Sequence, residues 1–422
     1  MRYVVAGLHA AGRSACAWLR KADPTAEIIG VDPAGGPLYS RPLISYVLSG
    51  EMPLEGMTVA GEDYWSRLGV TLVRERAVSL DAGRARLVLD SGRELPYDRL
   101  LLACGARPRK AQTGGEKAGE LCYFRGKADL ARILERVRPG GAAAVLGGGL
   151  VGFKLTMGLI KRGMSVTLLV TSPHPLSLNV DERAGAWVGE KLANAPNVTL
   201  KTSVSVTRLD DAGNGRLRLA LDDGETLDVD LAAAGKGVVP ETGWLADSGL
   251  ALRYGVVTDG FLRSSDERVF AAGDLAEAPD AVSGAPGVNA VWPVAVEQGR
   301  VAACNMAGVR TPYAGSMAMN AIPVFGTHMV SVGAVNPRLT VGCDFEEIGD
   351  PGGKYGYLKL VFREGRLIGA AGLGAAPRLG ELAFAVKRGL GRKQVPDWWF
   401  RNPKNAAPLA APYGFIPRLA AR

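Results

Sequence analysis

The stretch AAAVLGGGLVGFKL, residues 142–155, decides the fold of this 422-residue chain. Its apolar start predicts a β-strand, FKLTMGLIKRG predicts a helix, and SVTLLV predicts the next strand. Between strand and helix, Gly147, Gly149 and Gly152 complete a G-x-G-x-x-G pattern. Such glycines permit a tight turn and close helix–strand packing, and the helix N-terminus offers free N–H groups to a diphosphate. The stretch therefore predicts a βαβ dinucleotide-binding unit.

A second unit of this kind begins the chain, where RYVVAG, AAGRSACAWLRK and AEIIGVD predict strand, helix and strand. Gly7 and Gly12 take the first and last glycine places, and His9 replaces the middle glycine. Asp32, twenty residues after Gly12, is expected to accept hydrogen bonds from an adenosine ribose. Two such units in one chain are far more specific than one.

A third apolar run, in SSDERVFAAGDLAE, ends at Gly273 and Asp274. The aspartate either caps the next helix or hydrogen-bonds the polyol chain of a flavin whose diphosphate lies on the first turn. Further on, GVNAVWPVAVEQGRVAACNMAG predicts a helix from Trp292 to about Gly308. Residues 313–387 alternate apolar and polar groups and end in LGELAFAVKRG, which predicts a small antiparallel sheet with a helix.

Composition excludes several other classes of protein. No apolar run is long enough for a membrane span, and His9 and Arg13 interrupt the one N-terminal stretch that looks like a signal peptide. Five cysteines without CxxC or metal-ligand spacing favour reduced thiols, a cytoplasmic location and no metal site. The net charge of +8 is spread widely and comes with no nucleic-acid recognition motif, so an acidic protein partner explains it at least as well.

The order of these motifs, with LLLACGARP at 100–108 and LAAAGKGVVP at 231–240, resembles the pyridine nucleotide-disulfide oxidoreductase type of FAD/NAD(P) flavoprotein. The resemblance covers residues 1–310 and implies an α/β fold with two Rossmann-like domains, the second inserted in the first, and a small α+β C-terminal domain. The expected parts are an FAD domain (1–110 and 251–311), an NAD(H) domain (111–250), an interface domain (312–390) and a basic, proline- and aromatic-rich docking tail (391–422). Hydride would pass between nicotinamide and flavin at the domain junction.

The resemblance also implies the residues of each binding site. For FAD these are Gly7, His9, Ala11, Gly12, Asp32, Arg41, Ala77, Cys104, Gly105, Asp274 and Trp292. For NAD they are Gly147, Gly149, Leu150, Val151, Gly152, Thr171, Ser172 and Gly237. Thr171 and Ser172 stand where NAD sites usually carry an acidic residue, but there is no arginine cluster for a 2′-phosphate, so NAD(H) is favoured over NADP(H). Trp292 either covers the flavin ring or belongs to the core.

The chain departs from the family at three places. PLYSRPLISYVLSG (37–50) lacks the cysteines of a thiol relay, and Tyr39 to Pro42 resemble members that pass electrons to iron–sulfur or rubredoxin-like proteins, with Arg41 near the FAD. His9 is either a peroxide-handling base or a turn residue near the flavin phosphates. Lys154 stands where many relatives carry a glutamate. It is either a solvated helix residue or a cation near the flavin that raises the reduction potential of the flavin. The second possibility makes Lys154 the catalytic candidate.

The overall plan is similar to the FAD subunits of multi-subunit anaerobic enzymes such as phenylglyoxylate dehydrogenase and tungsten aldehyde oxidoreductase. That resemblance implies an FAD-dependent NAD(H) oxidoreductase subunit that exchanges electrons with an iron–sulfur, ferredoxin-like protein docked on the C-terminal domain and tail. Three alternatives stay open: a free-standing ferredoxin or rubredoxin reductase, an NADH oxidase or peroxidase, and a non-catalytic flavin redox sensor.

Overall fold

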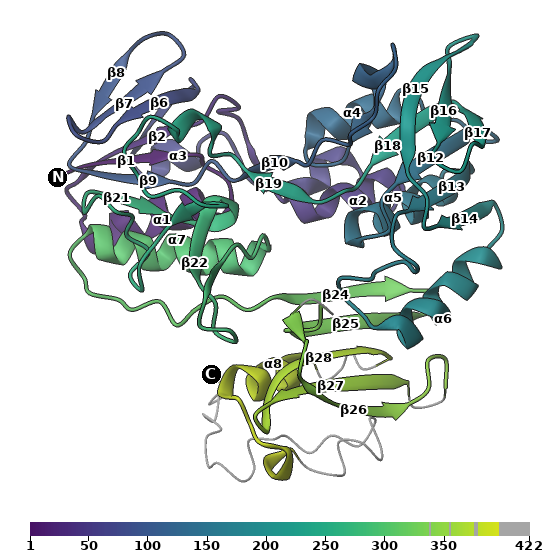
Figure 1. The fold of residues 1–422 in the computed structure, drawn as a ribbon. Coiled ribbons are helices and arrows are strands. Elements are labelled where there is room, and N and C mark those ends of the chain that lie inside the picture. The colour runs from purple at the N-terminus through teal and green to yellow at the C-terminus, as the bar shows by residue number, and fades with distance from the viewer. Residues whose placement is uncertain (337–338, 354–355, 375–378, 396–422) are drawn as a thin grey trace, which may run out of the picture. The chain divides into compact units, whose positions relative to one another are not determined.

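The computed structural model describes residues 1–336, 339–353, 356–374 and 379–395. The chain forms two compact units (Figure 1). The first contains residues 1–173 and 193–316, and the second is built from residues 174–192 and the described residues from 317 onward. Most of the predicted tail, residues 396–422, lies outside the described residues.

One half of the first unit is a parallel sheet with strand order β21-β9-β1-β2-β5. Its strands are β1 (Arg2–Ala6), β2 (Glu27–Val31), β5 (Val70–Val73), β9 (Arg99–Leu102) and β21 (Val269–Ala271). Helices α1 (Ala10–Ala22) and α7 (Trp292–Met306) pack on each other over one face. The predicted strand–helix–strand start of the chain and the predicted helix at Trp292 are confirmed.

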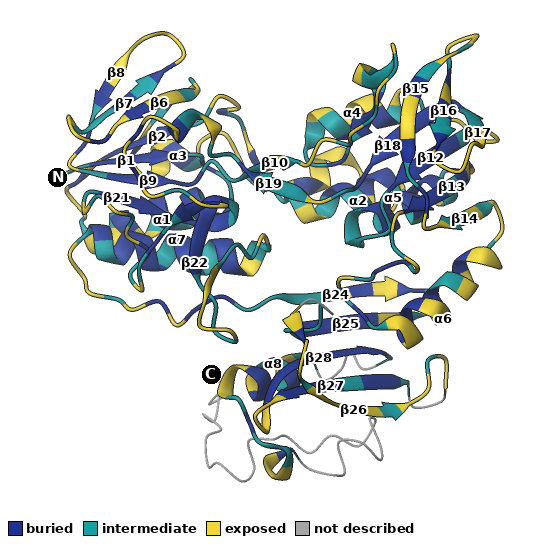
Figure 2. Cartoon of the chain, in the orientation of Figure 1, coloured by how far each residue is buried: buried dark blue, intermediate teal, exposed yellow. Residues whose placement is uncertain are grey.

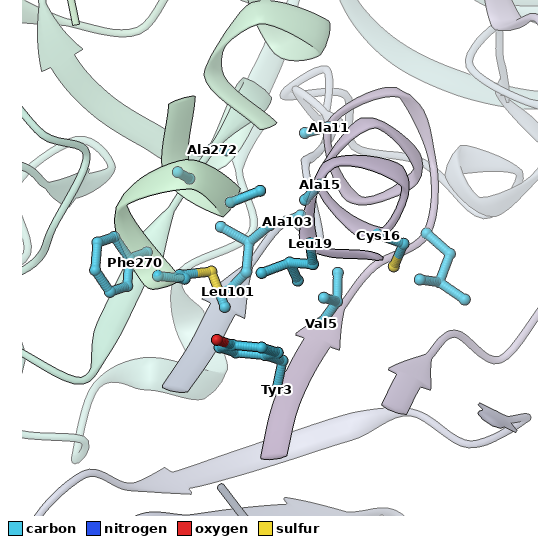
Figure 3. Packing of buried hydrophobic residues seen from close by; sticks show 14 of the residues in the cluster. Tyr3, Val5, Ala11, Ala15, Cys16, Leu19, Leu101, Ala103, Phe270 and Ala272 are labelled. Atoms are coloured by element: carbon cyan, nitrogen blue, oxygen red, sulfur yellow. The ribbon is translucent and has the colours of Figure 1, made fainter. Parts of the chain in front are cut away.

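Both faces of this sheet are buried, which is why its strands are apolar at consecutive positions. Tyr3 and Val5 of β1 belong to the core under α1 and α7, together with Leu101 and Phe270 (Figure 3). Val4, the residue between them, points to the opposite face and another core. That core includes the antiparallel strands β6 (Ala77–Asp81), β7 (Arg86–Leu89) and β8 (Glu94–Pro96).

The other half of the first unit is a second parallel sheet, with strand order β11-β18-β12-β13-β14. Its elements are β11 (Cys122–Tyr123), α4 (Lys127–Leu134), β12 (Ala142–Leu146), α5 (Leu150–Lys161), β13 (Ser165–Val170), β14 (Val198–Thr202) and β18 (Leu231–Ala234). An antiparallel sheet of β15 (Val206–Gly213), β16 (Arg216–Leu221) and β17 (Thr226–Val229) packs beside it. The strand–turn–helix–strand reading of residues 142–170 is confirmed.

Two strands link these halves. β10 (Ala106–Pro108) and β19 (Val238–Pro240) pair antiparallel where the chain enters and leaves the second sheet. The first unit also contains the short elements β3 (Leu38–Tyr39), α2 (Ile44–Leu48), β4 (Thr58–Ala60), α3 (Tyr64–Arg67), β20 (Val256–Val257), β22 (Ala276–Pro279) and β23 (Pro286–Gly287). The expected α/β class, with one Rossmann-like domain inserted in another, is confirmed.

The second unit is an antiparallel sheet with strand order β24-β25-β28-β27-β26. Its elements are β24 (Met319–Val324), β25 (Thr327–Gly333), β26 (Asp344–Gly349), β27 (Tyr357–Arg363), β28 (Arg366–Leu373) and α8 (Leu379–Arg388). The central strands β27 and β28 are mostly buried (Figure 2). The predicted antiparallel sheet with a helix is confirmed.

Helix α6 (Glu182–Ala193) follows the second dinucleotide unit in the sequence, but nearly all of it belongs to the second compact unit. Asp181, just before α6, accepts a hydrogen bond from the Tyr357 hydroxyl at 2.5 Å and pairs with Lys359 at 3.2 Å. Arg183 pairs with Glu347 at 3.4 Å. These contacts attach α6 to the antiparallel sheet.

Candidate functional site

The first glycine turn joins β1 to α1. A Cβ on Gly12 would overlap the carbonyl oxygen of Gly7, and Gly7 itself has a φ of +92° and faces the backbone at Ala103. Only glycine fits either place. Asp32, at the end of β2, accepts N–H groups from Leu8 and Ala34, each at 2.9 Å, which holds its carboxylate beside the turn. The structure thus brings Gly7, Gly12 and Asp32 together.

Four other predicted FAD residues have different surroundings. Ala11 is buried where α1 meets Gly299 of α7, and Cys104 donates its thiol to the Ala6 carbonyl at 3.4 Å. Burial raises the pKa of Cys104 to about 12, so it is a neutral thiol. Gly105 has a φ of +79°, and Ala77 begins β6, where it packs against the core that contains Val4.

Three rings gather at the middle position of the first turn. His9 lies edge-on to Tyr39, with ring centroids 4.9 Å apart, and edge-on to Trp292 at 6.5 Å. Burial, aided by the charges of Arg41 and Arg125, lowers the pKa of His9 to about 3. The imidazole is therefore neutral at physiological pH and can donate or accept a hydrogen bond.

Arg125 is a site residue that the sequence reasoning missed. It lies between β11 and α4, and its guanidinium pairs with Asp274 at 2.5 Å. Its Nε is buried without a hydrogen-bond partner among the described residues, and so is the Nε of Arg41. Two unsatisfied guanidinium donors beside a glycine turn fit an anionic ligand such as the FAD diphosphate. The only signal in the sequence was an arginine directly before a predictable helix start, RGKADL.

The second glycine turn joins β12 to α5. Gly147 has a φ of +116°, and a Cβ there would lie 2.8 Å from the Gly235 carbonyl oxygen. A Cβ on Gly152 would overlap the Gly147 carbonyl oxygen. Gly149 differs, because a Cβ built on it meets nothing within 4 Å. Of the three glycines in the G-x-G-x-x-G pattern, chain packing therefore restricts only Gly147 and Gly152. The open space at Gly149 fits a diphosphate that approaches the first amides of α5.

The remaining predicted NAD residues surround this turn. Leu150 and Val151 form the first turn of α5 and are half-buried. Thr171 is exposed and Ser172 half-buried directly after β13. Gly237, after β18, has a φ of +85° and open space around it. All of them follow the carboxyl ends of parallel strands, which is the edge where ligands of such sheets bind.

Lys154 lies on the face of α5 that packs against the short helix α2. One turn further along that face, a Cβ on Gly158 would lie 2.9 Å from the side chain of Leu48 in α2. Arg162 donates from Nε to the Leu48 carbonyl at 2.7 Å and from Nη2 to the Val47 carbonyl at 2.9 Å. Lys154 is half-buried, and burial lowers its pKa. Within the described residues, no carboxylate forms an ion pair with it.

Residues 1–336, 339–353, 356–374 and 379–395 contain no cluster of metal-ligating side chains. No helix in the same residues is long and apolar enough to cross a bilayer.

Comparison with known proteins agrees with this arrangement. A family model described as pyridine nucleotide-disulphide oxidoreductase matches residues 1–299. The epsilon subunit of an NADH-dependent phenylglyoxylate dehydrogenase from Aromatoleum evansii is 31% identical over 379 residues, 88% of either chain. A rubredoxin-NAD(+) reductase from Pseudomonas putida is 27% identical over 314 residues, 74% of this chain and 81% of its own.

The fold has solved counterparts as well. The reductase in a covalent putidaredoxin reductase–putidaredoxin complex shares it with a TM-score of 0.84 at 23% identity, over 92% of this chain and 94% of that one. From the family match and these relatives, the chain belongs to the pyridine nucleotide-disulphide oxidoreductase family and is an FAD-dependent NAD(H) oxidoreductase.

Proposed function

We propose that this oxidoreductase is the NAD-reducing FAD subunit of a larger complex that oxidises an aldehyde or a 2-oxoacid. The observation that carries the proposal is the phenylglyoxylate dehydrogenase epsilon subunit, which aligns over 88% of both chains. Electrons would arrive from an iron–sulfur, ferredoxin-like subunit. The absence of cysteine from residues 37–50 supports such a route, because a thiol relay has no residues there.

In this proposal, the first turn holds the FAD diphosphate through Gly7, Gly12 and the amides of α1, with the free guanidinium donors of Arg41 and Arg125 opposite. Asp32 binds the adenosine ribose and Asp274 the polyol chain. The bound flavin supplies the chemistry, since it accepts or donates a hydride and also transfers single electrons. Trp292 and His9 limit access of water to the ring, and Ala11, Ala77, Cys104 and Gly105 shape the walls.

The second turn holds NAD(H) in the same way. The glycines of the turn, Gly147, Gly149 and Gly152, let the diphosphate approach the N-terminus of α5. Leu150 and Val151 supply the first amides of that helix. The side chains of Thr171 and Ser172 bind the ribose, and Gly237 lies across the site from them. Neither arginine nor lysine occupies positions 170–175, so a 2′-phosphate finds no charge there and NADP(H) is the weaker substrate.

The domain boundaries are those expected from the sequence, and the partner docks on residues 312–390 and on the tail, residues 391–422. The tail lies outside the described residues beyond Val395. A cytoplasmic location is part of the same proposal and rests on five free cysteines.

Purification from the native host tests the proposal. We expect an iron–sulfur protein to co-purify with the full chain and to be lost when residues after Gly391 are deleted. Anaerobic NADH should bleach the bound flavin in both forms. Bleaching without any partner would favour a free-standing ferredoxin or rubredoxin reductase, as the rubredoxin-NAD(+) reductase similarity allows.

Two further outcomes would replace the proposal. Rapid NADH consumption by the isolated chain with oxygen or peroxide would indicate an oxidase or peroxidase, with His9 as the base. Failure of saturating NADH to bleach the flavin would indicate a non-catalytic redox sensor.

A further inference from the structure

A three-residue segment, Gly235–Lys236–Gly237, follows β18 beside the second glycine turn. β18 and β12 are parallel neighbours, paired up to Ala234 and Leu146, and the Gly235 N–H donates to the Leu146 carbonyl at 2.9 Å. A Cβ on Gly235 would lie 2.6 Å from the amide nitrogen of Gly152. The end of β18 therefore lies directly against the start of α5, and Lys236 carries the one side chain of the segment.

The strand order places this segment at a particular edge of the sheet. From β12 the chain proceeds through α5 to β13 on one side, whereas β18 lies on the other side of β12. Open parallel sheets bind their ligands in the crevice at such a reversal, outside the carboxyl ends of the two strands. At this crevice, Gly147 is the first residue after β12 and Lys236 is the second residue after β18.

The side chain of Lys236 begins beside the glycine turn. Its Cγ lies 3.5 Å from the position of a Cβ on Gly147, so the aliphatic stem follows the backbone of the turn. The residue is half-buried, and burial lowers the pKa of its ammonium group. Among the residues that the structure describes, no carboxylate is close enough to form an ion pair with it. A partly desolvated cation without a counter-charge is stabilised by an anionic ligand.

The second glycine turn, residues 147–152, carries no charged side chain of its own. The first turn of α5 contains no acidic residue, and no side chain caps its amides. Those amides supply partial positive charge only, whereas a dinucleotide diphosphate carries full negative charges. Arg41 and Arg125 supply full charges near the first turn, where both lower the pKa of His9.

We propose that Lys236 binds the diphosphate of the bound dinucleotide from the β18 side, opposite the amides of α5. The inference rests on the NAD(H) site proposed above and names a residue for it. Lys236 is then an affinity determinant for any ligand with that diphosphate, including ADP-ribose, which lacks the nicotinamide ring.

The test compares Lys236→Gln with wild type and with Lys110→Gln, a matched change at an exposed lysine of the same unit. Calorimetry on the FAD-loaded chain measures the Kd of ADP-ribose and of NADH. We expect Lys236→Gln to raise both Kd values about tenfold, which corresponds to about 1.4 kcal/mol, and Lys110→Gln to leave them unchanged. Lys236→Arg should retain most of the affinity, and salt should weaken ADP-ribose binding more in wild type than in Lys236→Gln.

Several results would overturn the inference. An unchanged Kd for ADP-ribose in Lys236→Gln would do so, even if NADH binding fell, because the contact would then be with the nicotinamide half. Equal salt dependence of the two proteins would also contradict a charge contact. Flavin content and the midpoint of thermal unfolding show whether Lys236→Gln is folded. If wild type binds no ADP-ribose, the NAD(H) site itself is wrong, whereas normal wild-type binding with an unaffected variant rejects Lys236 alone.

Discussion

Lys154 is the residue for which we predict an influence of a single charge on the flavin. It is half-buried on the α5 face that packs against α2, and in the described part of the chain no acid forms an ion pair with it. A cation at this junction favours the negatively charged reduced flavin by about 1–2 kcal/mol. Since about 30 mV corresponds to about 1.4 kcal/mol for a two-electron couple, Lys154→Ala should lower the flavin midpoint by about 20–40 mV. Anaerobic dye-coupled titration of wild type and Lys154→Ala measures the flavin midpoint potential.

The control for this prediction is Lys161→Ala, on the same helix but paired with Glu51 at the surface. That substitution should leave the potential unchanged, because the charge is further along α5 and screened by solvent. Equal potentials in wild type and Lys154→Ala would make Lys154 an ordinary helix residue.

His9 gives a pH-dependent prediction. Its pKa in the folded chain is about 3, below the ordinary 6.5, so the unfolded chain takes up a proton that the folded chain does not. The flavin-free protein should therefore lose stability as pH falls from 6.5 towards 3, by up to about 1.4 kcal/mol per pH unit. Urea denaturation of wild type and His9→Asn measures the loss, which should be smaller in the variant.

The same residue allows a test of where the flavin phosphates bind. The chain has only three histidines, so the ring of His9 can be followed by NMR after isotope labelling, with His9→Asn to assign it. A nearby diphosphate favours the imidazolium, so binding of FAD should raise the His9 pKa. If the His9 ring titrated at the same pH with and without FAD, the flavin phosphates would not lie near His9.

Some residues of the candidate site were predictable from the sequence and others were not. Gly7, Gly12, Gly147 and Gly152 were predictable because local backbone geometry demands glycine there and the demand repeats with fixed spacing. Arg125 was not predictable, because its partner Asp274 is 149 positions away and neither residue belongs to a spaced motif that includes the other. Its role depends on tertiary packing, which periodicity does not encode.

At the scale of elements, the β12–α5 turn contains glycines that chain packing requires and one, Gly149, for which we predict a role in ligand binding only. Gly152→Ala forces a Cβ onto the Gly147 carbonyl, so it should lower the free energy of unfolding by about 1–3 kcal/mol. Gly149 has φ −77° and ψ −175°, which alanine adopts freely, and open space around it. Gly149→Ala should therefore keep its stability within about 1 kcal/mol and yet raise the Kd of NADH about tenfold.

Urea denaturation, monitored by circular dichroism, measures the stability of Gly149→Ala and Gly152→Ala. NADH titration of the same samples measures their affinity for NADH. Normal NADH affinity in Gly149→Ala would show that the diphosphate does not lie over this turn. Unchanged stability of Gly152→Ala would contradict the close packing of α5 on β12.

Helix α6 is the element whose place was hardest to predict. Its sequence shows an amphipathic helix after a dinucleotide unit, and nothing in that pattern names the surface it covers. In the structure, Asp181 and Arg183 attach it to Lys359, Tyr357 and Glu347 of the antiparallel sheet. The two βαβ units and the antiparallel sheet were predictable from local periodicity, whereas this long-range pairing was not.

At the scale of the whole molecule, the net charge of +8 bears on how a partner is found. Opposite charge accelerates the encounter of two proteins, and salt removes the acceleration. We expect the rate of NADH-driven reduction of an acidic [2Fe–2S] or [4Fe–4S] ferredoxin to fall about tenfold between about 0.05 and 0.5 M NaCl. Stopped-flow absorbance at the iron–sulfur band measures that rate. Menadione, an uncharged acceptor, is the control, and its reduction should depend little on salt. If the reduction of both acceptors depended equally on salt, the salt would act on the reaction with NADH. Charge would then play no part in recognition of the partner.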